Sequence, residues 1–261
     1  MELSLKGKNA VVCGSTRGIG LAIAKELALL GANCTLFARN EPLLKEIVHS
    51  LPHKDGQEHG YRVADFSEPA TVKAAIESVV SKINIHILIN NTGGPPPGPL
   101  AEASTAAFEN AFRQHIINNQ LLAQCVLPGM KKEGYGRIIN IISASVKIPL
   151  HNLGVSNTVR AAVAAWAKTL SNEAGQYNVT VNNILPGSAK TDRLDSLIEE
   201  TVKKKNSSRE MVEKEMTDNI PLKRFGLPEE IANVAAFLAS PAASYVNGAS
   251  IPVDGGRTGS I

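Results

Sequence analysis

Short apolar segments alternate with longer amphipathic ones along the whole chain. Seven short segments have strand character, and they lie at residues 9–13, 34–38, 61–64, 86–90, 137–142, 180–185 and 250–253. Six main helical patterns lie between them, at residues 18–30, 42–50, 68–82, 105–130, 152–177 and 228–239. This alternation predicts successive βαβ units, which build a parallel sheet.

The central strand segments are apolar almost throughout, as in RIINII at residues 137–142. Such runs are typical of strands that helices cover on both faces. The chain is therefore predicted to be α/β, a single Rossmann-type doubly wound parallel sheet of about seven strands with helices on both faces. At about 250 residues, such a sheet is commonly one domain, and we expect one domain over residues 1–261.

The least apolar segment, residues 192–218, directly follows the sixth strand segment. A polar insertion at that place is typical of a mobile lid over a substrate. Lys203, Lys204 and Lys205 lie within it, in a stretch where lysine and glutamate intermix. We interpret them as the solvated face of a helix.

Composition excludes several classes of function. The formal net charge is only +3 and the basic residues are spread, so nucleic-acid binding is not indicated. No apolar run approaches the ~18 residues of a membrane helix, and the N-terminus has no signal region. Cys13, Cys34 and Cys125 are odd in number and far apart, which favours free thiols in a reducing compartment over disulfides or a metal site. We expect a cytoplasmic protein with no metal, membrane or nucleic-acid partner.

A glycine-rich turn follows the first strand segment and contains Gly14, Gly18 and Gly20. Glycine lets the backbone approach a pyrophosphate closely, and the helix that follows offers free N–H groups and a partial positive charge. Because the turn lies in the first βαβ unit, it predicts a dinucleotide-binding site.

The residues that end the second strand segment bear on which dinucleotide binds. An acidic side chain there would bond a ribose 2′-hydroxyl and repel a 2′-phosphate, but this chain has Ala38 and then Arg39. Arg39, joined by Arg17, can make charge-assisted hydrogen bonds to a 2′-phosphate. We predict NADP(H); the alternative is that both arginines are surface residues without a ligand.

Further motifs extend over essentially the whole chain. The turn has the spacing G-x-x-x-G-x-G, and Asp65, NNTGG at 90–94, PGSAKT at 186–191 and a C-terminal VDGG follow in order. In these features the chain resembles the short-chain dehydrogenase/reductase family. The chain also resembles a divergent bacterial subgroup that is described as 3-oxoacyl-acyl-carrier-protein reductase-like. The segments that carry this resemblance are NNTGGPPPG, SVKIP and SNxxR. The resemblance implies cofactor contacts by Gly14, Ser15, Arg17, Gly18, Ile19, Gly20, Asp65, Phe66, Asn91, Arg160, Pro186, Gly187 and Thr191, and the charge argument above adds Arg39.

The catalytic positions implied by the resemblance depart from the family pattern. The family uses Ser, Tyr, Lys and Asn; here Ser143 keeps the serine, while Ser156 replaces the tyrosine, Arg160 the lysine and His115 the asparagine. The four-residue spacing puts Ser156 and Arg160 on one helix face. A serine hydroxyl is a poor acid near neutral pH and arginine stays protonated, so we expect the usual proton relay to be lost.

Other side chains are candidates for the missing proton donor. His115 is expected beside Arg160, while Lys147 and His151 lie in the loop on the substrate side. Each could transfer a proton directly or through water, but the favoured interpretation of each is a packing or solvent-exposed residue.

Two functions remain open. The first is an NADP(H)-dependent oxidoreductase of fatty acid metabolism that reduces a small-molecule or acyl-thioester carbonyl, with Ser143 polarising the carbonyl. The second is a catalytically weak or inactive NADP(H)-binding sensor or regulatory protein. The resemblance further implies a homotetramer that associates through the helices at 105–130 and 152–177 and the last strand.

Overall fold

One parallel sheet organises the molecule. The computed structural model describes residues 1–54 and 56–260, and within them seven strands run in the order β3-β2-β1-β4-β5-β6-β7. The strands are β1 (Asn9–Cys13), β2 (Asn33–Ala38), β3 (Gly60–Val63), β4 (Ile87–Asn90), β5 (Gly136–Ile141), β6 (Val179–Pro186) and β7 (Ser250–Val253). The chain begins in the middle, winds outward to β3, and crosses back to continue from β4 to β7. The predicted doubly wound α/β sheet is confirmed.

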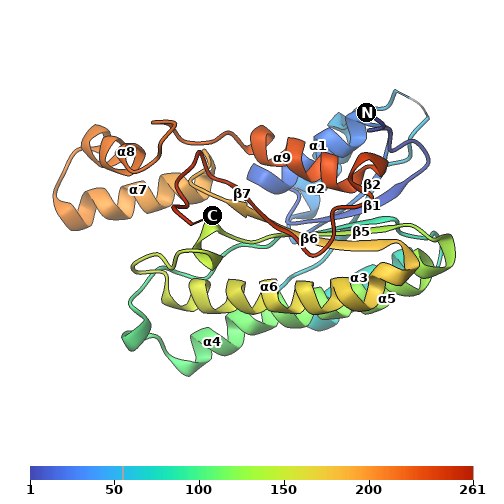
Figure 1. Ribbon diagram of the computed structural model, residues 1–261, viewed down its shortest axis with the longest axis horizontal. Helices are drawn as coiled ribbons and strands as arrows, with labels where there is room; N and C mark the ends of the chain where they lie inside the picture. The colour runs from blue at the N-terminus through green and yellow to red at the C-terminus, as the bar shows by residue number, and fades with distance from the viewer. Residues whose placement is uncertain (55, 261) are drawn as a thin grey trace.

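Helices cover both faces of this sheet. One layer contains α1 (Gly18–Leu29), α2 (Glu41–Ser50) and α9 (Pro228–Ala239), and the other contains α3 (Pro69–Val80), α5 (Asn118–Glu133) and α6 (Gly154–Ala174), as Figure 1 shows. Because side chains alternate along a strand, Ala10 and Val12 pack in the first layer while Val11 and Cys13 pack in the second. No helix formed by the described residues is long and apolar enough to cross a membrane.

The helix expected at 105–130 is interrupted. Helix α4 (Thr105–Phe112) is followed by a π-helical turn, Arg113–Ile117, before α5 begins. A π-turn accommodates an extra residue within an otherwise continuous helix, and such turns are frequent at functional sites. His115 lies at the centre of this turn, so the irregularity sets the position of a predicted site residue.

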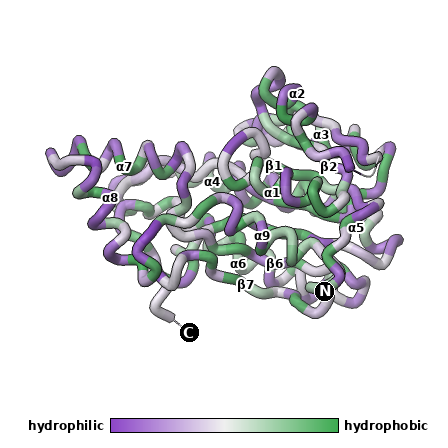
Figure 2. The backbone as a smooth tube through the Cα atoms, turned by 90° about the horizontal axis from the view of Figure 1, so that it is seen from above, coloured by the Kyte–Doolittle hydropathy of each residue, from purple (hydrophilic) through white to green (hydrophobic). Residues whose placement is uncertain are grey.

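The segment at 192–218 contains two helices, α7 (Asp192–Lys205) and α8 (Arg209–Asp218); the sequence analysis expected a helix around Lys203 to Lys205 but gave no bounds, and it did not place α8. They project beyond the strand ends (Figure 1), and Figure 2 shows hydrophilic and hydrophobic residues mixed along both. Their apolar residues form a separate small cluster with neighbours, consisting of Leu194, Ile198, Val212, Ile220 and Phe225. The described residues therefore form nine α-helices, more than the six main ones predicted. Lys203 to Lys205 occupy the last turn of α7, where positive charge is favourable.

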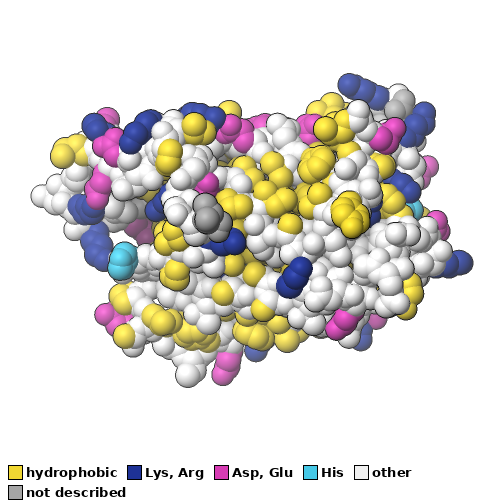
Figure 3. Space-filling model, in the orientation of Figure 1, with side chains coloured by type: hydrophobic (Ala, Val, Ile, Leu, Met, Phe, Trp, Pro, Cys, Tyr) yellow, Lys and Arg dark blue, Asp and Glu magenta, His cyan; other side chains and the backbone are white. Residues whose placement is uncertain are grey.

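Strand β7 forms one edge of the sheet and carries apolar surface. Figure 3 shows hydrophobic side chains gathered over the face that includes β7 and α9. Among the exposed ones near this edge, Tyr245 is fully exposed and Leu222 is 62% exposed. An exposed edge strand beside apolar side chains is a site where another chain can pair or pack.

A buried row of polar side chains crosses four neighbouring strands. Asn90 Nδ2 donates to Asn140 Oδ1 at 2.8 Å, Asn140 Nδ2 to Asn183 Oδ1 at 2.9 Å, and Asn183 Nδ2 to Ser250 Oγ at 3.0 Å. The same residues are aligned partners in the strand register. A one-residue slip between strands would break the row and leave buried amides without partners, so the row fixes the register from β4 to β7.

We predict that Asn140→Ala lowers the free energy of unfolding by about 2–5 kcal/mol. The change removes the middle of the row and leaves a donor on Asn90 and an acceptor on Asn183 buried and unpaired, each costing about 1–3 kcal/mol. Urea unfolding followed by circular dichroism measures the effect. Asn219→Ala, at an exposed asparagine, is the control and should change stability by less than about 0.5 kcal/mol. Equal effects for the two variants would contradict the role of the row.

Candidate active site

The turn between β1 and α1 fits only glycine at key positions. Gly14 and Gly18 have φ values of +58° and +53°. A methyl group on Gly14 would lie 2.7 Å from the backbone oxygen of Asn91, and one on Gly20 would lie 2.1 Å from the oxygen of Gly14. Helix α1 has no side-chain cap and no acidic residue in its first turn. Its free N–H groups therefore fit a pyrophosphate, as the sequence predicts.

Two predicted cofactor contacts also hold this turn in place. Asn91 Nδ2 donates to the carbonyl oxygens of Cys13 and Gly14, at 3.2 Å each, and so ties the end of β4 to the end of β1. The buried Ser15 donates to the carbonyl oxygen of Phe37 at the end of β2, at 3.4 Å. The turn is thus fixed between the two strands on either side of β1.

The two arginines expected at a 2′-phosphate have different surroundings. Arg39 follows β2, is exposed, and forms no ion pair with a carboxylate among the described residues. Asp65 accepts hydrogen bonds from Ser67, which mainly lower its pKa, and the charge of Arg39 adds a smaller lowering. Arg17 instead forms a 3.0 Å ion pair with Asp192 at the start of α7. Arg39 therefore has the freer positive charge.

The loop after β6 reaches the glycine turn from the other side. Pro186 ends β6, and Thr191 precedes the first residue of α7. A methyl group on Gly18 would lie 3.1 Å from Cγ2 of Thr191, so the loop passes close to the pyrophosphate position. One on Gly187 would contact Asp254 at 2.8 Å, so this glycine is needed where the loop meets the C-terminal segment. The remaining predicted contacts, Ile19 and Phe66, are half-buried and pack against the two core layers.

Ser156 and Arg160 form a contact on α6, at the end of β5. Arg160 Nε donates to Ser156 Oγ at 3.3 Å, and its Nη1 donates to the carbonyl oxygens of Ile141 and Ile142, at 3.2 and 2.8 Å. Burial of the guanidinium, helped by the charge of Arg193, lowers the pKa of Arg160 to about 10, so it stays protonated at neutral pH.

Ser143 directly follows the carbonyl groups that hold Arg160. Its Oγ accepts from the backbone N–H of Ser145 at 3.1 Å. Ser156 Oγ likewise accepts from Arg160. Neither hydroxyl donates a hydrogen bond to another described residue, so each hydroxyl hydrogen is available to donate to a substrate oxygen.

His115 is neutral and deeply buried beside this pair. It is only 4% exposed, and its pKa is lowered to about 3 by burial and, to a smaller extent, by the charge of Arg160. A hydrogen bond joins it to the backbone of Gly93 in the loop after β4. With a pKa this low, the ring carries no imidazolium proton to give near neutral pH. Its position suits a residue that holds the Gly93 loop.

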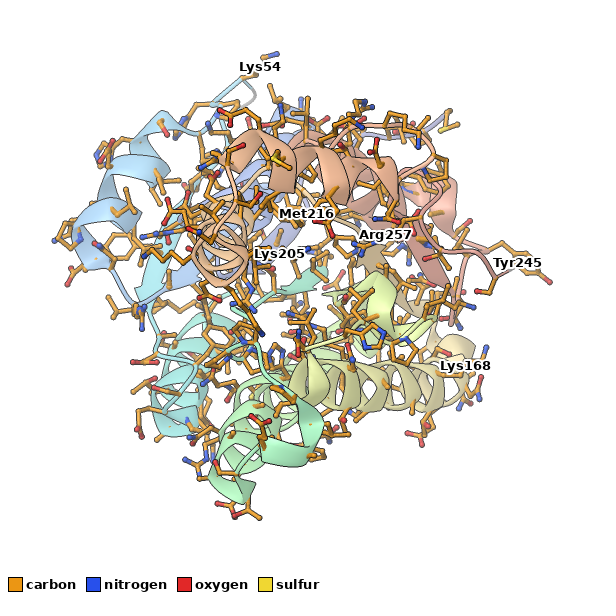
Figure 4. All side chains as sticks on the ribbon, turned by 90° about the vertical axis from the view of Figure 1, so that its left-hand side faces the viewer. Lys54, Lys168, Lys205, Met216, Tyr245 and Arg257 are labelled. Carbon is orange, nitrogen blue, oxygen red and sulfur yellow. The ribbon has the colours of Figure 1, made fainter. Side chains whose placement is uncertain are left out.

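Several basic residues lie at the open end of the site, and not all of them were expected from the sequence. Figure 4 looks onto this end, with Lys205 of α7 and Met216 of α8 in front of the strand ends. Lys147 and His151 are exposed on the segment between Ser143 and α6. Sequence reasoning missed Arg193, whose Nη2 donates to the carbonyl oxygen of Pro95 at 2.8 Å and lies near Arg160. Its place in a polar segment gave no signal for this contact.

We predict that His115→Asn flattens the dependence of stability on acid pH. In the unfolded chain a histidine takes up a proton below about pH 6.5, whereas folded His115 does so only near pH 3. Folding is therefore increasingly disfavoured as the pH falls through this window, by about 1.4 kcal/mol per pH unit from this residue. Urea unfolding at pH 7, 5.5 and 4.5 measures the slope. Exposed His151→Asn is the control, and parallel curves for the original chain and His115→Asn would contradict the burial of a neutral ring.

Comparison with known proteins agrees with this geometry. The family model described as enoyl-(acyl carrier protein) reductase matches residues 14–258. The 3-oxoacyl-[acyl-carrier-protein] reductase FabG of Aquifex aeolicus is 35% identical over 260 residues, covering 98% of this chain and 99% of the relative. The 7alpha-hydroxysteroid dehydrogenase of Escherichia coli is 32% identical over 256 residues, covering 98% and 96%. L-sorbose reductase from Gluconobacter frateurii, crystallised with NADPH and L-sorbose, has a TM-score of 0.94 at 34% identity, with both chains fully covered. The chain therefore belongs to the short-chain dehydrogenase/reductase family.

Proposed function

We propose that this protein is an NADP(H)-dependent oxidoreductase that reduces a carbonyl compound in a site without the family's tyrosine and lysine. The observation that carries the proposal is that the groups suited to the cofactor and the candidate catalytic groups lie along the same edge of the sheet. The glycine turn fits a dinucleotide, Arg39 offers a free charge for its 2′-phosphate, and the strand ends lead directly to Ser143, Ser156 and Arg160. A similar reductase was crystallised with NADPH, which supports this choice of cofactor.

The proposed chemistry uses hydrogen bonds and charge in place of a general acid. Bound NADPH supplies the hydride to the carbonyl carbon. The free hydroxyl hydrogens of Ser143 and Ser156 donate to the carbonyl oxygen, and Arg160 stabilises the negative charge that develops on it. The proton then comes from water, which the exposed Lys147 and His151 can order at the open side of the site.

We also propose that α7 and α8 form the substrate lid and that the protein is a homotetramer. Two ion pairs join α7 to α8, Lys205–Glu215 and Arg209–Asp195, and the two helices share a small apolar cluster, so the lid can move as one unit. Two apolar surfaces support association. One is the face around β7, and the other is a shallow groove of about 500 Å³ on α4 and the π-turn, with Phe112 and Ile117 exposed.

The proposed cofactor preference depends on Arg39. We predict that Arg39→Gln weakens NADPH binding about 10- to 100-fold and leaves NADH binding within twofold, because it removes charge-assisted bonds to the 2′-phosphate. Arg17→Gln should have a smaller effect, since Asp192 already shares its charge. Titration followed by nicotinamide fluorescence measures both, with the distant, exposed Arg113→Gln as the charge control. Tighter binding of NADH than NADPH by the unaltered protein would refute the proposed preference.

The proposed activity has a direct test. NADPH oxidation is followed with β-ketoacyl thioesters, quinones and small ketones, and we expect turnover of at least one class. Ser143→Ala should lower kcat/KM about 10²–10³-fold by removing a donor to the substrate oxygen. Ser145→Ala is the matched control, because its buried hydroxyl has no hydrogen-bond partner among the described residues. Equal activity in the two variants would contradict the role of Ser143.

A second candidate function is an NADP(H)-binding sensor or regulatory protein with little or no turnover. The observation that favours it concerns the positions of the family's proton relay. Ser156, protonated Arg160 and neutral His115 lie there, and none of them is an effective general acid near neutral pH. Clean NADPH binding without oxidation by any carbonyl class would select this function. Turnover that Ser143→Ala abolishes would exclude it.

A further inference from the structure

Two guanidinium groups converge at the substrate end of the site. A methyl group on Gly94 would lie 3.2 Å from Nη2 of Arg160 and 3.4 Å from Nη2 of Arg193. Arg160 comes from α6 and Arg193 from the first turn of α7, so two elements far apart in the sequence bring their charges to one point. Neutral backbone oxygens hold them there, those of Ile142 and Pro95, at 2.8 Å each.

No carboxylate balances these two charges. Among the residues that the structure describes, neither Arg160 nor Arg193 forms an ion pair. The nearest acidic residues of α7 are engaged elsewhere, because Asp192 binds Arg17 and Asp195 binds Arg209. The charge of Arg193 also contributes to the lowered pKa of Arg160, which indicates that the two groups repel each other. An anion placed between them would remove that repulsion and gain charge-assisted hydrogen bonds.

The arginine pair is formed by other residues than the glycine turn that fits a pyrophosphate. That turn passes close to Thr191 at Gly18. Arg193 is two residues further along, and its Nη2 donates to the carbonyl oxygen of Pro95 in the loop after β4. That loop continues to Gly98, whose N–H donates to the carbonyl oxygen of Asn152 at 2.7 Å, just before α6 begins. Arg160 also donates to Ser156 Oγ, at 3.3 Å, so the pair includes a direct neighbour of one of the two hydroxyls that we propose to bind the substrate carbonyl.

We propose that the substrate is an oxo acid, a carbonyl compound whose carboxylate binds Arg193 and Arg160. This inference rests on the proposed reductase function and names its substrate class. The planar guanidinium groups match a carboxylate, which can accept two hydrogen bonds side by side. In the reaction the hydride of NADPH goes to the carbonyl carbon and a proton from water goes to its oxygen, giving a hydroxy acid and NADP⁺. The carboxylate is not consumed, and Arg193 acts in specificity.

The test compares acids with uncharged partners of the same length. The substrates are 2-, 4- and 5-oxohexanoate and their methyl esters, each assayed by NADPH oxidation. We expect the preferred acid to exceed its ester at least tenfold in kcat/KM. Arg193→Leu should lower kcat/KM for that acid 10- to 100-fold while the ester changes less than twofold. Lys203→Leu removes the same charge from the far end of α7 and is the control, expected to leave the preference unchanged.

A binding measurement separates this inference from the proposed activity. Hexanoate carries the carboxylate but has no carbonyl to reduce, and methyl hexanoate is its uncharged partner. Calorimetry with the NADPH-bound protein should show hexanoate binding that Arg193→Leu weakens at least tenfold. If hexanoate binds in this way but no carbonyl compound is reduced, the reductase proposal fails and the anion site stands.

Three results would overturn the oxo-acid proposal. The first is reduction of esters as efficient as that of acids in the unaltered protein. The second is an Arg193→Leu variant that loses NADPH affinity and reduces acids and esters equally poorly, which would assign Arg193 to the cofactor. The third is equal binding of hexanoate and methyl hexanoate.

Discussion

All seven strands end at one edge of the sheet because they run parallel, and the site depends on this constraint. Asn91, Ser143 and the loop up to Thr191 each follow a different strand, and they meet only if those strands keep their relative positions. The buried row from Asn90 to Ser250 resists slippage between β4 and β7. A slip between strands would therefore leave buried amides unpaired and would also displace the candidate site residues from one another.

A second constraint is the charge of Arg160. A guanidinium cannot release its proton at neutral pH, and burying it is costly unless its N–H groups find acceptors. The carbonyl oxygens of Ile141 and Ile142 and the hydroxyl of Ser156 supply them, but they are neutral and leave the charge uncompensated. Burial and, to a smaller extent, the same charge lower the pKa of His115. The buried guanidinium thus contributes to keeping its neighbour neutral and leaves a positive field beside Ser156.

The strands and the glycine turn were predictable because local patterns determine them. Each predicted strand agrees with the observed one to within one residue at either end, and the need for glycine at Gly14 and Gly20 follows from backbone approach alone. The π-turn at Arg113–Ile117 was missed because one extra residue barely alters helical periodicity. The bounds of α7 and the existence of α8 were missed because the apolar residues of these helices pack mainly on each other, and Arg193 was missed because its partner Pro95 lies almost a hundred residues earlier.

The arrangement around Ser143 is more specific than cofactor storage requires. Loss of a general acid typically costs about 10²–10⁴-fold in rate, and each well-placed donor to a developing oxyanion restores about 10²–10³-fold. In the mechanism that we propose, two serine hydroxyls and a fixed guanidinium would therefore offset the lack of a general acid for a substrate whose oxygen bears most of the developing charge. A sensor would need only the glycine turn and Arg39. A hydroxyl hydrogen on each serine, beside a cation that no carboxylate among the described residues neutralises, suits the transition-state stabilisation that we propose.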